Sequence, residues 1–360
     1  MTIQNQITAF DDAKAEAFAE RFVGTLNEAA LAVMTSLGHR AGLLDGLAAN
    51  PGLSSAALAD EIGANERYLR EWLGVMVTSG VVDYDPAAKS YTLPPEHAAF
   101  LTRAASPNNM AVTTQFIGLA ALVEDKLLDR VKSGEGLCYH HFDRFHEVMA
   151  EDSAQLVVSN LESAILPVVP GLIEQLDRGI DVADFGCGAG RAMMTLARAF
   201  PKSRFHGFDL CEDAFAETVA EARFEGLTNL QFRARDLSSV ASVGQFDLVT
   251  AFDAVHDQAD PKGFLRLVHR SLRSGGLFLM QDIGGSRHLE KNLDNPFAPL
   301  LFMISSMHCM PISLGQGGPG LGAMWGVETA EEYLAQTGFA SVEMHRLPHD
   351  DLNAYFIARV

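Results

Sequence analysis

The sequence predicts an α/β fold, with a parallel sheet in the second half of the chain and a smaller, largely helical domain before it. From Leu172 onward, short apolar segments alternate with helix-prone segments, as a parallel sheet requires. Before this point, alanine-rich segments carry apolar residues at helical spacing. The chain has 360 residues, which is long enough for two domains with separate cores.

Composition and charge exclude several classes of function. The formal net charge of −19 opposes binding to nucleic acid phosphates. The longest apolar stretch, Phe297 to Met310, is interrupted by Pro299, and we expect it to be too short to span a membrane. No signal peptide is visible at the N-terminus. The four cysteines are Cys138, Cys187, Cys211 and Cys309. Because they form no C-x-x-C pair, we expect a reduced, cytoplasmic protein.

The first domain has the pattern of a winged helix-turn-helix. Residues 13–50 predict a helical region that Gly38 and Gly42 bring to an end. A short helix capped by Ser54 and a second helix over 66–77 follow. The segments 81–84 and 90–93 flank an Asp-Pro turn and predict a β-hairpin. We expect this domain to occupy residues 1–100 and a helical linker that contributes to the pocket to occupy residues 101–170.

DNA binding is the first hypothesis for such a module, but its charges argue against it. Between Ser54 and Phe100, three basic residues stand against seven acidic ones. A net-negative helix and wing make a poor partner for phosphates. We therefore expect this domain to pair and pack, while a transcriptional regulator that binds a ligand and reads DNA stays as the alternative.

The sheet is expected in residues 171–360, together with an insertion over 284–326. Two of its expected strands are continuous apolar runs, which is typical of buried parallel strands. The expected strands are 180–184, 204–208, 230–233, 246–251 and 276–282, with a final pair near 341–346 and 354–359.

A glycine-rich turn follows the first of these strands and precedes a helix. The turn runs from Asp184 to Gly190 as Asp-Phe-Gly-Cys-Gly-Ala-Gly. Glycines let the backbone approach a ligand, and a helix N-terminus favours an electron-rich group. Asp209 ends the next strand, about 20 residues on, where nucleotide-binding folds place an acidic side chain on the ribose. The third glycine comes one residue too early for the dinucleotide pattern G-x-G-x-x-G.

This turn resembles the S-adenosylmethionine (SAM) loop of class I methyltransferases. The resemblance implies that SAM is the cofactor, with S-adenosylhomocysteine as its product. It places the ribose on Asp209 and the adenine near Asp236, although Asp236 has the pattern of a helix N-cap as well. The full set of expected cofactor-binding residues is Asp184, Gly186, Gly188, Gly190, Asp209, Leu210, Asp236, Leu237 and Phe252.

His256 and Asp257 follow the fourth strand of the sheet. With Asp260 they resemble the H-D-W-x-D segment of winged-helix small-molecule O-methyltransferases, in which the histidine is the general base. Gln258 stands where that family has tryptophan. An imidazole suits removal of a hydroxyl proton, and Asp257 would orient the ring. The alternative is a histidine that caps a turn.

A second segment is similar to the same family. Residues 145–153 match its F-x-x-x-M-x-x-x-S helix, which lines the cofactor and acceptor pocket. Polarizable Met149 suits packing beside a sulfonium, and Phe145 suits facing a cation. An ordinary buried helix face would give the same spacing.

The insertion over 284–326 has methionine and aromatic residues around a glycine-rich centre, which suits a lid that excludes water. An ordinary flexible loop is the alternative. Its expected acceptor contacts are Met303, Met307, His308 and Trp325.

A metal site is not expected. His140, His141 and His146 lie near Cys138, but they lack the i, i+4 spacing of a helical zinc pair.

The resemblance covers nearly the whole chain and implies a SAM-dependent methyltransferase. The expected acceptor is a hydroxyl, or a nitrogen or carbon nucleophile, of a small molecule that is flat or lipophilic. In this family the N-terminal domain mediates homodimerisation. No partnership with nucleic acid or membrane is expected, and a nicotinamide oxidoreductase is disfavoured by the glycine spacing.

Overall fold

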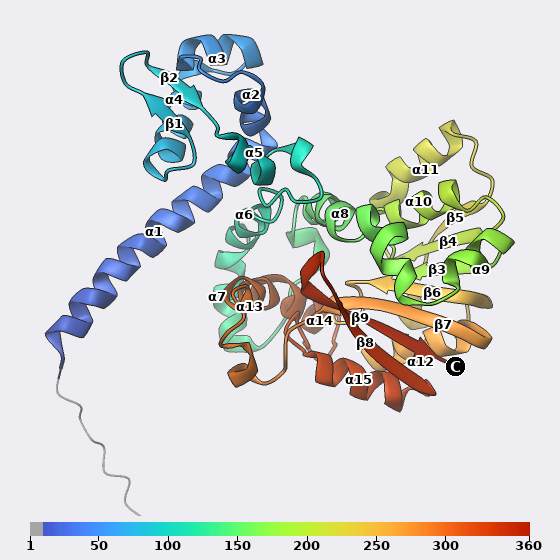
Figure 1. Cartoon of the computed structure of the whole chain (residues 1–360). Coiled ribbons are helices and arrows are strands. Elements are labelled where there is room, and N and C mark those ends of the chain that lie inside the picture. Colours follow the sequence, from blue (N-terminus) through green and yellow to red (C-terminus); the bar gives the residue numbers. More distant parts are fainter. Residues whose placement is uncertain (1–9) are drawn as a thin grey trace, which may run out of the picture. The chain divides into compact units, whose positions relative to one another are not determined.

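The computed structural model in Figure 1 describes residues 10–360. These residues form two compact units, divided after Gly118. Each unit has its own hydrophobic core.

The first unit is a winged helix-turn-helix, as the sequence predicts. Its third helix begins after Ser54, whose hydroxyl accepts a hydrogen bond from the Ala57 N–H, and ends at Gly63 in the left-handed conformation. Its elements are α1 (Asp12–Arg40), α2 (Leu43–Ala49), α3 (Ser55–Ile62), α4 (Glu66–Thr78), β1 (Asp83–Asp85), β2 (Ser90–Thr92), α5 (Pro95–Leu101) and η1 (Arg103–Ala105).

Gly38 does not end the first helix, as expected from the sequence, but lies within α1. A Cβ atom at this position would come within 2.6 Å of Trp72 Nε1 on α4. The Trp72 indole is buried there and donates a hydrogen bond to the Met34 carbonyl at 2.9 Å. Gly38 therefore serves the close packing of α1 on α4, and the helix ends at Arg40.

One face of α1 is apolar and exposed. Phe18 is 55% exposed and Leu26 is 60% exposed. Within the described residues, the large exposed apolar side chains of this helix are Phe18, Phe22, Val23, Leu26, Val33 and Leu37.

The second unit contains a seven-stranded sheet in the order β5-β4-β3-β6-β7-β9-β8. The first five strands in this order are parallel, and β9 is antiparallel to both of its neighbours. This architecture confirms the predicted parallel sheet and its final pair of strands, which are antiparallel to each other. The strands are β3 (Asp181–Phe185), β4 (Arg204–Asp209), β5 (Leu230–Ala234), β6 (Phe246–Phe252), β7 (Leu272–Ile283), β8 (Ser341–Leu347) and β9 (Asp350–Arg359).

Two helical layers cover this sheet, because alternate side chains of a strand enter different cores. Phe185 of β3 packs with α12 and α15, whereas Val182 of the same strand packs with α9 and α10. Helix α6 (Gln115–Ala121) crosses the division after Gly118. The α-helices of the second unit are α7 (Glu124–Ser133), α8 (Phe145–Leu156), α9 (Leu172–Arg178), α10 (Arg191–Ala199), α11 (Ala216–Phe224), α12 (Pro261–Ser271), α13 (Ala298–Ile304), α14 (Met310–Gly315) and α15 (Val327–Gln336).

An ion-pair network holds the amino-terminal edge of the sheet. The Asp181 carboxylate at the start of β3 accepts hydrogen bonds from Arg204 at 2.6 and 2.8 Å and from Arg273 at 2.7 Å. Arg273 also pairs with Asp247. The hydrogen bond from Arg204 lowers the pKa of Asp181, and so does the one from Arg273, although burial opposes both. Four neighbouring strands, β4, β3, β6 and β7, are thereby joined at the edge opposite their carboxyl ends.

The insertion over 284–326 is largely helical. It contains α13, the π-helical turn η9 (Ser305–Cys309) and α14, which follow one another without a break. The middle of α14 is buried, and the Ser313 hydroxyl donates to the Gln258 carbonyl at 3.1 Å. The glycines after this helix include Gly317, Gly320 and Gly322, all with positive φ.

Within the described residues, one helical run, Ala298–Gly315, is long enough and apolar enough to cross a membrane, as judged by length and composition alone. A bent pair, Phe145–Val168 with Leu172–Arg178, passes the same test only if taken as one span. The sequence-based expectation that the apolar stretch is too short is therefore wrong, because the helix continues beyond Met310. In this fold 39% of the run is buried within the protein.

Candidate active site

The glycine-rich turn joins β3 to α10 at the carboxyl edge of the sheet. Gly186, Gly188 and Gly190 all have positive φ, which glycine adopts without strain. At Gly188, where φ is 51°, a Cβ atom would meet no atom within 4 Å, so the space beside the turn is open. Strand order reverses between β3 and β6, and ligands of such sheets bind outside the strand ends at that point.

Asp209 at the end of β4 fixes the turn. Its Oδ2 accepts a hydrogen bond from Gly188 N–H at 2.8 Å, and its Oδ1 accepts one from Cys211 N–H at 3.0 Å. Both bonds leave further lone pairs on the carboxylate for a ligand hydroxyl.

Asp184 is buried beneath the same turn. Its Oδ1 accepts a hydrogen bond from the Thr250 hydroxyl of β6 at 2.7 Å. Burial raises the pKa of Asp184 to about 7, while the Thr250 hydrogen bond works in the opposite direction. Near neutral pH this carboxyl group is therefore poised between its two protonation states.

Asp236 caps the short helix η7 (Leu237–Ser239). Its Oδ1 accepts from the Ser238 N–H at 2.9 Å and from the Ser238 hydroxyl at 2.6 Å. Asp236 therefore caps a helix, as the alternative interpretation predicts, and it also lines the cavity.

One cavity brings the predicted cofactor residues together. Its wall contains all nine of them, with Phe145, Met149 and Asp257. Sequence reasoning missed other residues of this wall, chiefly Cys211, Arg235, Ser238 and Asp253. Three of these could have been found, because each follows the end of a parallel strand or its neighbouring turn.

The charge of the cavity is predominantly acidic. Two arginines, Arg191 and Arg235, line it against five carboxyl groups: Asp184, Asp209, Asp236, Asp253 and Asp257. A site of this kind favours a cationic ligand over one that carries a pyrophosphate. The donor set therefore fits a nucleoside that bears a sulfonium and an ammonium group.

His256 lies just behind this wall and is 2% exposed. Its Nδ1 is 2.7 Å from Asp282 Oδ1, and its Nε2 is 3.2 Å from Asp257 Oδ1. His256 is not among the residues that line the cavity, whereas Asp257 is. The carboxylate that orients Nδ1 is thus Asp282 at the end of β7, a residue that the sequence reasoning did not identify.

The two carboxylates govern the charge of His256. Burial alone would lower its pKa, but the adjacent Asp282 and Asp257 raise the pKa well above its usual range. The two carboxylates therefore favour the protonated form of the imidazole. It must lose that proton before it can accept one.

Asp253 stands at the end of β6 with a φ of 56°, which is strained for a residue other than glycine. Burial raises the pKa of Asp253 to about 8, although the nearby His256 opposes this shift. Asp253 directly follows Phe252, so its place after the predicted strand is the signal in the sequence that could have marked it as a cavity residue.

Aromatic side chains form another part of the wall. Phe145 and Met149 of α8 line the cavity, and the Tyr139 hydroxyl donates to Asp257 Oδ2 at 3.4 Å. His308 stacks on the Phe145 ring, with the ring centroids 3.6 Å apart, and does not line the cavity. Burial lowers the pKa of His308 to about 3, so this ring is neutral.

Three other predicted acceptor contacts lie outside the cavity wall: Met303, Met307 and Trp325. Trp325 belongs to the buried core and donates its Nε1–H to Asp282 Oδ1 at 3.0 Å. The insertion does reach the cavity through Gln316, whose side chain donates to the Asp257 carbonyl at 3.2 Å.

Two sequence families match the chain. Residues 29–103 match the Rv2258c-like winged HTH domain, and residues 176–309 match the Methyltransferase domain. Among curated proteins, the ubiquinone biosynthesis O-methyltransferase of Methylobacterium sp. (strain 4-46) is 33% identical over 106 residues. That match covers 29% of this chain and 41% of the relative, so the chain spans about two fifths of the length of the curated relatives it matches.

Solved structures share the fold over almost the full length. Human N-acetylserotonin methyltransferase, solved in complex with SAM, aligns with a TM-score of 0.69 at 15% identity and covers 98% of this chain and 99% of its own. Mitomycin 7-O-methyltransferase aligns with a TM-score of 0.66 at 19% identity over 97% of this chain and 100% of its own. An O-methyltransferase family protein from Burkholderia thailandensis aligns with a TM-score of 0.63 at 14% identity, over 98% of both chains.

The fold and the cavity at the carboxyl edge of the sheet define a Rossmann-like class I methyltransferase domain. The chain thus carries a winged HTH domain that matches over residues 29–103 and a methyltransferase domain that matches over residues 176–309.

Proposed function

We propose that this chain transfers the methyl group of SAM to a hydroxyl group of a small, flat or lipophilic molecule. The observation that carries the proposal is an acidic cavity with Asp257 on its wall and His256 directly behind it, 3.2 Å from Asp257 Oδ1. Bound SAM supplies a methyl group on a positively charged sulfur. Within the wall, Asp209 is suited to the ribose hydroxyls and Asp236 to the adenine side.

The acceptor is expected to lie between the glycine-rich turn and the aromatic wall. Phe145 and Met149 offer apolar area to a flat ring, and Tyr139 adds a phenol beside Asp257. Positioning of the acceptor oxygen opposite the methyl group supplies most of the rate enhancement in such a displacement.

The acceptor proton is proposed to pass to the His256–Asp257 pair. Asp282 keeps a proton on Nδ1 of His256, so Nε2 is the nitrogen that gains and loses the second proton. Asp257 faces both Nε2 and the cavity, and thus connects the two. The oxygen–methyl bond would form as the sulfur–methyl bond breaks, S-adenosylhomocysteine would leave, and the hydroxyl proton would pass from the acceptor oxygen to the pair.

The N-terminal domain is proposed to join two copies of the chain. The exposed apolar face of α1 is too extensive for a helix that faces water alone, and a second copy would cover it. On α4, Arg67 pairs with Glu71 and Arg70 pairs with Glu66, so neither cation is free for phosphates. These pairings favour the enzyme over a regulator that reads DNA.

Calorimetric titration with SAM, S-adenosylhomocysteine and NAD tests the cofactor. We expect micromolar binding of both sulfur nucleotides and none of NAD. Binding of NAD alone would overturn the proposal.

Transfer of a labelled methyl group from SAM to a panel of phenolic acceptors tests the reaction. The His256→Ala variant is assayed alongside, and its SAM affinity should stay at the wild-type level. Labelling of amines in place of phenols would refute the choice of a hydroxyl acceptor.

A further inference from the structure

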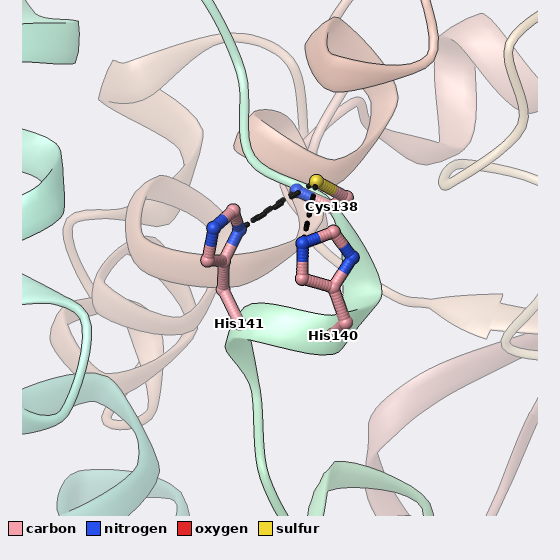
Figure 2. A group of neighbouring side chains, drawn as sticks. All are labelled: Cys138, His140 and His141. Carbon is pink, nitrogen blue, oxygen red and sulfur yellow. Dashed lines mark hydrogen bonds between the residues drawn. The ribbon is translucent and has the colours of Figure 1, made fainter.

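The turn before α8 brings together three side chains that bind metals. Cys138 lies beside His140 and His141 of the short helix η2 (Tyr139–His141), and Figure 2 shows the two rings directed toward the sulfur. Cys138 Sγ is 3.5 Å from His140 Nε2 and 3.6 Å from His141 Nδ1. One donor atom from each residue lies within 4.8 Å of the other two.

These distances match the edges of a zinc coordination tetrahedron. With Zn–S near 2.3 Å and Zn–N near 2.0–2.1 Å, tetrahedral angles hold sulfur and nitrogen about 3.6 Å apart. Both sulfur–nitrogen separations are already at this value. A thiolate with two imidazoles is a donor set that zinc favours over magnesium or calcium.

The donor atoms are also accessible. Cys138 and His140 are exposed and His141 is half-buried, so an ion can enter from solvent. His141 Nδ1 accepts a weak hydrogen bond of 3.3 Å from the Cys138 N–H. That nitrogen therefore carries a lone pair, which is the form that binds a metal.

We propose that Cys138, His140 and His141 bind Zn²⁺, with water at the fourth position. This proposal departs from the sequence-based expectation that this region binds no metal, because Cys138 rather than His146 completes the set. His146 instead lies against the Tyr139 ring, with the centroids 5.9 Å apart.

The proposed ligands flank a residue of the cavity wall, so a bound metal would stabilise this part of the wall. Tyr139 lies between the ligands in sequence and lines the cavity. On either side, Leu137 donates its N–H to the Pro311 carbonyl at 2.8 Å, and buried Phe142 contacts the His308 ring. Bound Zn²⁺ would brace the turn that presents Tyr139 to Asp257.

Cobalt titration of the untagged, metal-stripped full chain tests binding. We expect a thiolate-to-Co²⁺ charge-transfer band and the strong visible bands of a tetrahedral site, both abolished by added Zn²⁺. The variants Cys138→Ser, His140→Ala and His141→Ala should each weaken Zn²⁺ binding more than about tenfold, the lower end of the loss seen when even an outer-shell partner is removed.

Two control variants locate the ion. His146→Ala removes a neighbouring histidine that is not a proposed ligand, and Cys309→Ser removes the cysteine beside His256 and Asp257. Both should bind Co²⁺ like the wild type. Absence of the charge-transfer band, or a band that survives in Cys138→Ser and disappears in Cys309→Ser, would overturn the site.

Amide hydrogen exchange tests the bracing. Zn²⁺ should slow exchange over residues 138–145 in the wild type and leave it unchanged in Cys138→Ser. Binding without any slowing would refute the structural role of the ion.

Discussion

Trp325 and His256 share a single carboxylate oxygen. Asp282 Oδ1 is 2.7 Å from His256 Nδ1 and 3.0 Å from Trp325 Nε1, and all three residues are buried. The insertion therefore supports the proposed base from behind the cavity, through a tryptophan that the sequence predicts as an acceptor contact.

The first prediction concerns the pH dependence of methyl transfer. Because Asp282 and Asp257 raise the pKa of His256, the rate should increase with pH on an alkaline limb above the usual histidine range. Asp282→Asn removes one of these charges and should move the limb to lower pH. Measurement of kcat against pH checks this.

Trp325→Phe is the matched control, since it removes the shared hydrogen bond and keeps both charges. Its limb should remain on the alkaline side. An unshifted limb in Asp282→Asn would exclude His256 as the group that titrates.

Asp209→Ala should weaken SAM binding strongly. The variant loses the acceptor for Gly188 N–H and Cys211 N–H as well as the proposed ribose contact. A hydrogen bond to a charged group contributes about 1.5–3 kcal/mol, so the Kd should increase roughly 10- to 150-fold. Calorimetry measures the change, and Asp209→Asn, which keeps one accepting oxygen, should lose less. Equal affinity in Asp209→Ala and the wild type would remove this residue from the site.

Binding of SAM should release protons near neutral pH. Asp184 has a pKa of about 7 when the cavity is empty of cations, and a nearby positive charge favours its ionised form. Calorimetry in buffers with different ionisation enthalpies counts the protons released. S-adenosylhomocysteine, which lacks the sulfonium charge, should release fewer, and Asp184→Asn should abolish this component. Proton uptake would contradict the prediction.

The ligand-free protein should lose stability as the pH increases from about 5 to about 8. The pKa values of Asp184 and Asp253 are raised in the folded state to about 7 and about 8, so the folded state holds protons that the unfolded state has lost. Stability from such groups is present at low pH and lost as pH passes through the folded values. Glu328 acts oppositely, but its pKa of about 2 confines its effect to acid.

Urea denaturation across this pH range measures the free energy of unfolding. Asp184→Asn should flatten the decline. A free energy that increases toward pH 8 would show that these carboxyl groups are ionised in the folded protein.

Leu26→Asp should separate the proposed dimer. The substitution places a charge in the middle of the exposed apolar face of α1. Glu28→Lys also changes a charge but lies on the other side of the helix, so it should leave the assembly intact. Sedimentation or light scattering gives the mass in solution. A monomeric wild-type protein would refute the assembly itself.

The sequence predicts the strands, and the nine residues that it assigns to the cofactor all line one cavity, because the signals of both are local. An apolar run followed by glycines or an aspartate marks a buried strand and its carboxyl end, as at Asp184 and Asp209. The prediction that Gly38 ends a helix is wrong because glycine is needed there to make room for Trp72, which belongs to another helix.

Relationships between distant segments had no such signal. Asp282 meets Trp325 across 43 residues, and Tyr139 meets Asp257 across 118. The spacing of α-helical metal ligands does not predict that Cys138 lies beside the two histidines either. These three residues occupy a 3₁₀ helix and its N-cap rather than an α-helix.

The Asp181 network on the amino-terminal edge allows stability and substrate preference to depend on opposite edges of one sheet. Its arginines hold the strands together at the edge opposite the cavity, so side chains at the carboxyl ends of those strands can change without loss of these ion pairs. A lineage of such chains could acquire new acceptors by altering loops after β6 and β7 alone. Melting temperature and substrate preference should consequently vary independently among its natural variants.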